Sequence, residues 1–193
     1  MIDFTGFGKI ARYSREIVVT EKIDGTNSQI YIDQESDSDP FCIYQMDGFR
    51  LFAGSRKRWI TPEDDNFCFA RWAKENACEL VQVLGPGRHF GEWWGSGIQR
   101  GYGLKEKRFS LFNTGRWNEC NIPKCCNVVP ILYEGIFDKF HAETIIESLR
   151  CGGSIAAPGF MNPEGIIIYH SAGNVYFKKT LKNDDVPKSL KGE

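Results

Sequence analysis

The chain has 193 residues, of which 41% are hydrophobic and 13% aromatic, enough to fill the core of one domain. Its 24 basic and 25 acidic residues give a formal charge of −1, which excludes a protein that attracts nucleic acid over its whole surface. The first residues contain no apolar signal core, and no later apolar run is long enough to span a membrane. The seven cysteines are irregularly spaced, unlike a secreted disulfide framework, so we expect a cytoplasmic protein with reduced thiols.

Short β-rich runs predict strands along most of the first 60 residues. Residues 17–20 and 28–32 flank a polar segment centred on Asp24 and Gly25, which predicts a strand, a tight turn and a second strand. The acidic residues 33–40 are expected to form a solvated hairpin loop, with further strands at 41–46 and 49–56.

The clearest helix is expected after residue 61. Thr61 suits the N-cap position and Pro62 the first helical position. Apolar residues then recur at three- and four-residue spacing, namely Phe67, Ala70, Ala73, Ala77, Leu80, Val81 and Leu84. The segment Gly85, Pro86 and Gly87 would end this helix.

The remainder of the chain again favours strands, at 89–94, 108–113 and, as a buried strand, 128–136. A second helix is expected at 141–150, ended by Gly152 and Gly153, followed by a hairpin of 165–170 with 174–180 and a polar tail at 182–193. There is no internal repeat and no linker between domains. The pattern predicts a single α+β domain over residues 1–193, with mainly antiparallel sheets and flanking helices.

The segment TEKIDGTN at 20–27 joins an amine, carboxylates and a glycine turn at the end of a predicted strand. A lysine must lose its proton before it can attack phosphorus, and an ordinary lysine pKa of about 10.4 makes that rare at neutral pH. Arg56, Lys178, Lys179 or a metal ion would favour the neutral amine if the fold brings them near. By itself the segment also suits an exposed lysine at a hairpin turn.

Five segments occur in the order found in the covalent nucleotidyltransferase superfamily of ligases and capping enzymes. They are TEKIDGTN at 20–27, AGSR at 53–56, FGEWWG at 90–95 with RFSLFN at 108–113, PEGIII at 163–168 and VYFKKT at 175–180. The chain most resembles the RNA ligase branch and its small phage and bacterial members. The resemblance implies a nucleotidyltransferase fold with ATP bound between the sheets, Mg²⁺ or Mn²⁺ as the metal, and a phage or viral origin.

The resemblance also implies roles for individual residues. Lys22 would be the nucleophile that carries AMP as a lysyl adduct, and Glu21 would read the adenine edge. Residues Ile23, Asp24, Gly25 and Asn27 would shape the turn around the nucleotide.

Further roles follow from the other motifs. Arg56 would hold the nucleotide sugar and help to bind nucleic acid, and Glu92 would contact the ribose hydroxyls. Phe112, with Phe109 as second choice, would stack on the purine, and Glu164 would be the metal ligand. Without the motif context, Arg56 suits a surface charge, Glu92 a strand edge and either phenylalanine a core position.

The last motif departs from the family pattern. Many relatives have two lysines separated by one residue, whereas Lys178 and Lys179 are adjacent here and Thr180 occupies the second place. Lys178 aligns with the first lysine and is the candidate for the α-phosphate. Alternation along a strand would place Lys178 and Thr180 on one face and Lys179 on the other, so Lys179 is a weaker candidate ligand. Lys182 would help only if the strand ends before it.

The aromatic and basic segment 92–109 has two interpretations. Its cations Arg100, Lys105, Lys107 and Arg108, interleaved with Trp93, Trp94 and Tyr102, either grip phosphates and stack on bases or belong to a solvated loop over the core.

The expected activity is an ATP-dependent RNA ligase that joins RNA ends or nicks carrying a 5′-phosphate and a 3′-hydroxyl. Little chain follows the last motif, so we expect no additional C-terminal domain and a helper protein in its place. Three alternatives stay open: a DNA nick ligase, a GTP-using capping-type guanylyltransferase, and a catalytically inactive relative that binds nucleic acid.

Overall fold

The computed structural model describes residues 2–35 and 37–182, in which the strands form two sheets. The four-stranded sheet has the order β11-β10-β1-β9, made of β1 (Glu16–Lys22), β9 (Ile131–Ile136), β10 (Gly165–His170) and β11 (Val175–Thr180). The seven-stranded sheet has the order β3-β4-β2-β6-β7-β8, with β5 paired to β4. Its strands are β2 (Thr26–Asp33), β3 (Cys42–Met46), β4 (Phe49–Ser55), β5 (Trp59–Ile60), β6 (Gly87–Gly95), β7 (Lys107–Leu111) and β8 (Cys126–Val128). Only β7 and β8 pair in parallel among these strands, which confirms the expected mainly antiparallel α+β fold.

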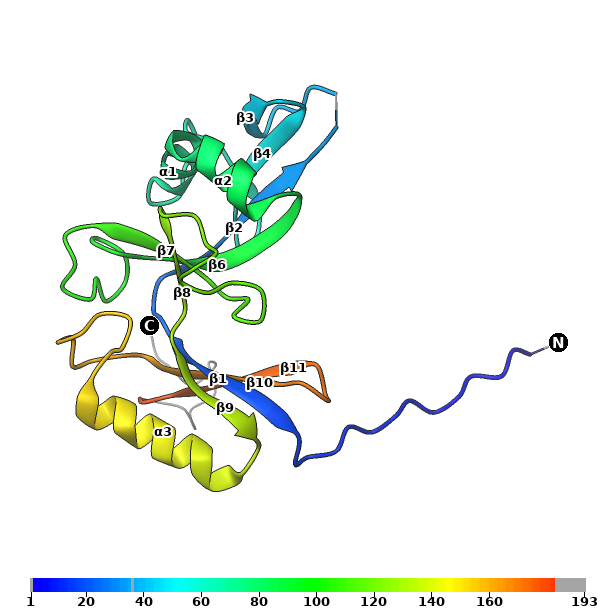
Figure 1. Ribbon diagram of the computed structural model, residues 1–193, viewed down its shortest axis with the longest axis vertical. Helices are drawn as coiled ribbons and strands as arrows, with labels where there is room; N and C mark the ends of the chain where they lie inside the picture. Colours follow the sequence, from blue (N-terminus) through cyan, green and yellow to red (C-terminus); the bar gives the residue numbers. More distant parts are fainter. Residues whose placement is uncertain (1, 36, 183–193) are drawn as a thin grey trace.

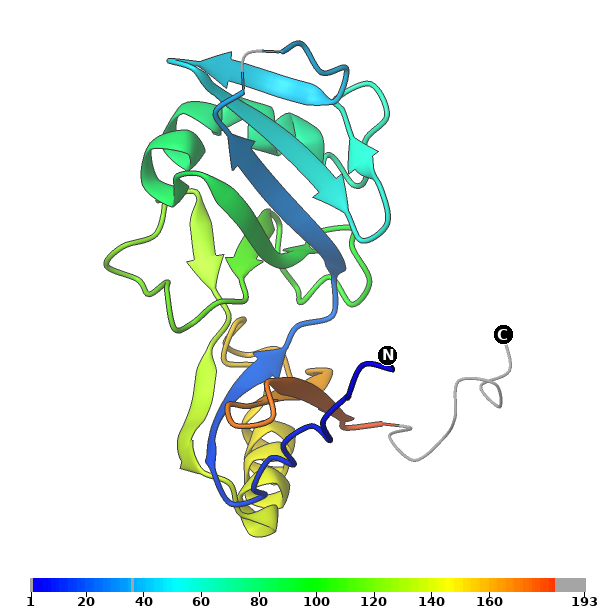
Figure 2. The same ribbon diagram turned by 90° about the vertical axis from the view of Figure 1, so that its right-hand side faces the viewer.

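Each sheet has one face covered by helices (Figures 1 and 2). The short helices α1 (Phe69–Glu75) and α2 (Ala77–Leu84) pack on the seven-stranded sheet, and α3 (Lys139–Gly152) packs on the four-stranded sheet. Every second residue of a strand points towards the helices and fills the core. In the seven-stranded sheet these residues include Ile30, Ile32, Leu51, Ala53, Trp93 and Phe109, and in the four-stranded sheet Ile17, Val19, Ile166 and Ile168. The opposite face of each sheet is left for other contacts.

Within the described residues the chain passes between the sheets twice. Ile23–Gly25 connects β1 to β2, and Val129–Pro130 connects β8 to β9. The two crossings lie side by side, because the Glu21 N–H donates to the carbonyl oxygen of Pro130 at 3.0 Å. A small apolar cluster made of Ile23, Trp94, Tyr102, Val129 and Ala157 fills the junction. Residues 26–128 therefore build one sheet with its helices, and the flanking segments build the other.

Two predicted strand connections and the continuity of one predicted strand are wrong. The strands β1 and β2 do not form a hairpin, because β1 pairs with β9 and β10 whereas β2 pairs with β4 and β6. The loop at 33–40 does not join paired strands either, since β4 lies between β2 and β3. The predicted strand 128–136 breaks at Pro130, which lacks the N–H that a continuous ladder would need.

The helix predicted from Pro62 to Leu84 is also wrong in its beginning and its continuity. Phe67 and Cys68 have φ values of 52° and 64°, which stop a helix from running through them. Asp65 serves the beginning of α1, where its carboxylate accepts the N–H groups of Ala70 and Arg71. Asn76, with φ −104° and ψ 10°, then separates α1 from α2.

The C-terminal half follows the prediction more closely. Helix α3 begins after the N-cap Asp138, whose side chain accepts the N–H of Phe140, and it ends at Gly152, followed by the C-cap Gly153 with φ 79°. The hairpin of β10 with β11 is present. Apart from Lys182, the predicted polar tail lies outside the described residues. No helix among those described has the length and apolar character needed to cross a bilayer.

Candidate functional site

Lys22 and Glu164 meet at the edge of the four-stranded sheet although 142 residues separate them. Lys22 is the last residue of β1 and pairs with Gly165, the first residue of β10, so the fold places Glu164 directly beside it. Lys22 Nζ lies 2.5 Å from Glu164 Oε2, and the two side chains are 23% and 17% exposed. A half-buried amine is therefore held in direction by a carboxylate.

Glu92 reaches the same site from the seven-stranded sheet. It lies on β6 opposite Asn27 of β2, and its Oε1 accepts the N–H of Gly25 at 3.1 Å. Burial raises the pKa of Glu92 to about 7, although Lys22 and the Gly25 N–H favour its charged form. Near neutral pH this carboxyl group can therefore donate or accept a hydrogen bond, which suits a sugar hydroxyl.

Gly25 is fixed by the close approach of β6 to the turn after Lys22. A Cβ added at Gly25 would lie 2.5 Å from the carbonyl oxygen of Trp93 and 2.7 Å from Cβ of Trp94. Any larger residue would push Lys22 away from Glu92, so the glycine sets the distance between the two sheets at the site.

Arg100 ties the turn after Lys22 to the segment that precedes Glu164. Its Nε donates to the carboxylate of Asp24 at 2.7 Å, and its Nη1 donates to the carbonyl oxygens of Asn162 and Pro163 at 2.9 and 3.2 Å. The Asp24 N–H donates to the hydroxyl of Tyr102 at 2.8 Å. The sequence predicted Arg100 only as a candidate phosphate ligand and missed this bracing contact with Asp24. No local pattern in the sequence indicates a contact between residues 76 positions apart.

The aromatic residues of the segment 92–109 are not available to stack on bases. Trp93, Trp94 and Tyr102 are only 1–3% exposed and pack in the apolar clusters. Arg108 is paired with Glu106. The interpretation that these three rings stack on bases is therefore wrong, and they pack in the core instead.

Glu21 lies on the opposite face of β1 from Lys22 and is 1% exposed. Its Oε1 accepts the hydroxyl of Ser154 at 2.6 Å, and its Oε2 accepts the N–H groups of Ile155 and Ala156 at 2.8 and 2.9 Å. The predicted contact with adenine would require the loop at 154–156 to move. In this structure Glu21 anchors that loop.

Three other candidates are placed by the two sheets. Ile23 is buried in the junction cluster and shapes the crossing through packing. The strand pairing puts Asn27 beside Glu92 on the face away from the helices. Phe112 is 37% exposed just after β7, whereas Phe109 is fully buried against Phe69, so Phe109 is wrong as a stacking residue.

The lysines of β11 divide between two faces as the alternation predicted. The register pairs Lys178 with Ile167 and Thr180 with Gly165, the partner of Lys22, so Lys178, Thr180 and Lys22 share one face. Lys179 points to the other face, where its Nζ lies 3.1 Å from Glu143 of α3. As a nucleotide ligand Lys179 is therefore not supported by its position. Strand β11 ends before Lys182, which donates to Asn162 Oδ1 at 3.0 Å.

Arg56 follows β4 in an exposed turn with Lys57 and Arg58. It lines a pocket with Thr26, the first residue of β2, which is four positions after Lys22 in the chain.

A divalent metal fits the site only together with substrate oxygens. No group of three or more His, Cys, Asp or Glu side chains could hold a metal within residues 2–35 and 37–182. Glu164 offers a hard carboxylate oxygen, and Mg²⁺ commonly binds through one or two carboxylates plus the phosphates of a nucleotide.

Residues 15–183 match the RNA ligase family. The chain belongs to the RNA ligase family. The match includes every candidate site residue from Glu21 to Lys179. A comparison with curated proteins finds no match.

Solved structures of the Naegleria gruberi RNA ligase share the fold of this RNA ligase family member. A variant of that protein with ATP and Mn has a TM-score of 0.59 and 20% identity, over 88% of this chain and 51% of that chain. Another variant without ligand has a TM-score of 0.56 and 21% identity, over 87% of this chain and 50% of that chain. This chain thus spans about half the length of these solved relatives.

Proposed function

We propose that this chain is an ATP-dependent RNA ligase whose Lys22 forms a covalent lysyl-AMP intermediate. The observation that carries the proposal is the meeting of three side chains from distant segments: Lys22 2.5 Å from Glu164, with Glu92 approaching from the other sheet. Membership of the RNA ligase family supports it.

The first step is the transfer of AMP to Lys22. The neutral amine Nζ forms a bond to the α-phosphorus of ATP, the bond from that phosphorus to the pyrophosphate oxygen breaks, and the proton released from Nζ passes to solvent. Glu164, in contact with Nζ, directs the amine, and Lys178 on the same face would contact the α-phosphate. A divalent ion held by Glu164 and the phosphates would neutralise charge on the leaving pyrophosphate.

Two further transfers complete ligation. The 5′-phosphate of an RNA end takes AMP from Lys22 through a new phosphoanhydride bond, which returns the free amine. The 3′-hydroxyl of the neighbouring end then attacks the 5′-phosphorus, and AMP leaves. Each step breaks one bond at phosphorus and forms another, so no further reactant is needed.

The remaining residues take supporting roles in the proposal. Glu92 would bind the ribose hydroxyls and Phe112 would stack on the purine, while Arg56 would contact nucleic acid. Asp24, Gly25 and Asn27 would fix the turn. Glu21 is assigned to the loop at 154–156, and Lys179 is left out of the nucleotide site because Glu143 holds it on the other face.

Intact mass after incubation with ATP and Mn²⁺ or Mg²⁺ tests the proposal. The wild-type protein should gain the mass of one AMP, and Lys22→Ala should gain nothing while keeping its circular dichroism spectrum. Exposed Lys124→Ala serves as the matched control and should label like the wild type. Labelling of Lys22→Ala would reject the nucleophile, and absence of label in the wild type would reject the adenylyl transfer.

Two parallel assays address the alternatives. Labelling with GTP instead of ATP would identify a guanylyltransferase, and faster sealing of DNA nicks than of matched RNA nicks would identify a DNA ligase. The helper protein, the cytoplasmic location and the phage origin stay predictions.

A further inference from the structure

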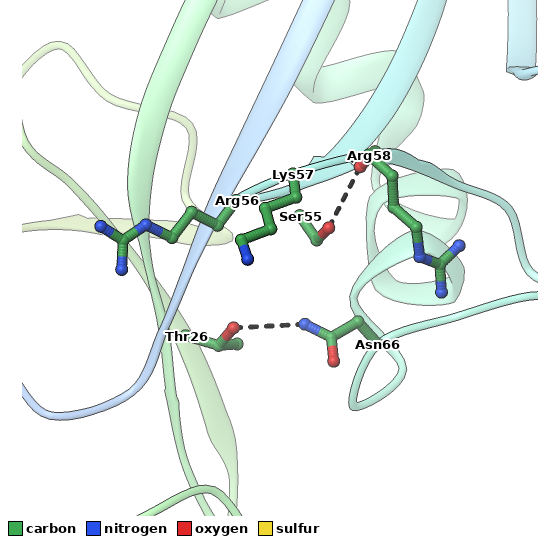
Figure 3. A pocket seen from close by; sticks show the side chains of 6 residues that line it. All are labelled: Thr26, Ser55, Arg56, Lys57, Arg58 and Asn66. Carbon is green, nitrogen blue, oxygen red and sulfur yellow. Dashed lines mark hydrogen bonds between the residues drawn. The ribbon is translucent and has the colours of Figure 1, made fainter.

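The polar pocket that Arg56 lines lies at the end of the seven-stranded sheet where β2 begins. It has a volume of about 370 Å³ and is lined by Thr26, Ser55, Arg56, Lys57, Arg58 and Asn66 (Figure 3). Thr26 begins β2, the three cations follow β4, and Asn66 belongs to the loop before α1. Three chain segments therefore converge on one small, polar space.

The charges of this pocket favour an anion. Arg58 is paired with Asp64, but within the described residues no carboxylate pairs with Arg56 or Lys57. Figure 3 shows Arg56 and Arg58 pointing to opposite sides, with Lys57 between them and directed towards Thr26. Lys57 is thus the cation that an anion in the pocket would meet.

Neutral donors complete the lining. Asn66 Nδ2 donates to Thr26 Oγ1 at 3.2 Å, which leaves the Thr26 hydroxyl proton and the second amide proton of Asn66 to donate elsewhere. An ammonium group with hydroxyl and amide donors is the usual environment of a phosphate in proteins.

The pocket is on a different side of the sheet from the nucleotide site. Side chains alternate along β2, so Thr26 points to the face covered by α1 and α2, whereas Asn27 points to the face of Glu92. A mononucleotide held by Glu92 and Lys22 would have to reach around the end of the sheet. A polymer, which continues beyond the reacting end, has no such limit.

The distance also suits a polymer. Thr26 is four positions after Lys22, which limits the distance between their Cα atoms to about 14 Å. Phosphates follow one another at about 3.4 Å along the axis of each strand of a duplex, so the distance between the pocket and Lys22 corresponds to a few nucleotides of a polymer.

We propose that this pocket binds a backbone phosphate of the polynucleotide substrate, with Lys57 as its principal cation and Thr26 and Asn66 as hydrogen-bond donors. The proposal rests on the proposed function in taking RNA as the substrate. It assigns Lys57 to substrate binding and not to the transfer of AMP.

Binding of a nicked RNA duplex with a 5′-phosphate at the nick, dye-labelled at a far end, tests this assignment by fluorescence anisotropy at several salt concentrations. Lys57→Ala should bind about three- to tenfold more weakly at low salt. The slope of log K against log salt should fall by about 0.9, as expected for the loss of one phosphate contact. Lys57→Arg should restore most of the affinity, and Lys124→Ala should behave like the wild type.

Intact mass after incubation with ATP separates this inference from the proposed function. Lys57→Ala should form lysyl-AMP as the wild type does. Unchanged RNA affinity and salt slope in Lys57→Ala would overturn the inference. Lost adenylation with intact RNA binding would also overturn it, because the pocket would then hold the phosphates of ATP. A wild type that never forms the adduct would reject the proposed function, while weaker RNA binding by Lys57→Ala would still support the pocket.

Discussion

Replacing Glu92 by Gln should stabilise the protein above neutral pH. Burial raises the pKa of Glu92 from its ordinary 4.5 to about 7, so the folded protein binds this proton more tightly than the unfolded chain. The free energy of unfolding therefore falls as pH rises from about 4.5 to about 7 and stays low above that. A difference of about 2.5 pKa units corresponds to about 3 kcal/mol.

Gln cannot ionise, but its amide oxygen can still accept the N–H of Gly25. Urea unfolding of the two proteins at pH 4, 5, 6, 7 and 8 should give nearly equal free energies at pH 4 and an advantage of about 3 kcal/mol for Glu92→Gln at pH 8. The exposed control Glu75→Gln should change stability by less than about 0.5 kcal/mol at every pH. An advantage of Glu92→Gln that does not grow between pH 4 and pH 8 would refute the reasoning.

Two further variants test the braces around Lys22. Arg100→Ala should slow lysyl-AMP formation, measured by timed intact mass, at least about tenfold, because Asp24 and the carbonyls before Glu164 lose their common donor. The exposed control Arg71→Ala should keep the wild-type rate. A wild-type rate in Arg100→Ala would contradict the role of Arg100 as a brace. Glu21→Ala should lower the free energy of unfolding by about 2–4 kcal/mol, because it leaves the donors of Ser154, Ile155 and Ala156 without their acceptor. Hydrogen exchange at the amides of Ile155 and Ala156 should become faster, and continued protection there would show that another group holds the loop.

The hydrophobic periodicity of the chain predicted most elements but not their partners. The runs at 28–32, 49–56, 165–170 and 174–180 contain strands β2, β4, β10 and β11, as their content of β-branched and aromatic residues predicted. Composition does not say which strand lies beside which, so the expected turn between β1 and β2 is instead a passage between the two sheets. The helix after Thr61 failed for a related reason, since apolar spacing does not detect the positive φ angles of Phe67 and Cys68.

The candidate site shows the same division. Motif order singled out Lys22, Glu92 and Glu164, and the fold does bring Lys22 and Glu164 into contact. The contacts of Glu21 with Ser154 and of Arg100 with Asp24 depend on side-chain directions across 133 and 76 residues of sequence. No local pattern encodes them. Burial excludes Trp93, Trp94 and Tyr102 as stacking residues. The sequence could not predict this, since an aromatic residue in a strand or loop can face either the solvent or the core.

The adjacent crossings at Ile23–Gly25 and Val129–Pro130 have a mechanical consequence. Because both connections between the two sheets lie at one place, a rotation of one sheet relative to the other would have its axis there. Lys22 directly precedes the first crossing and so lies next to this axis. Arg50 and Arg88 pair with the end of β2 that is farther from the crossing. A rotation there would displace the far end of the seven-stranded sheet more than it displaces the reactive amine.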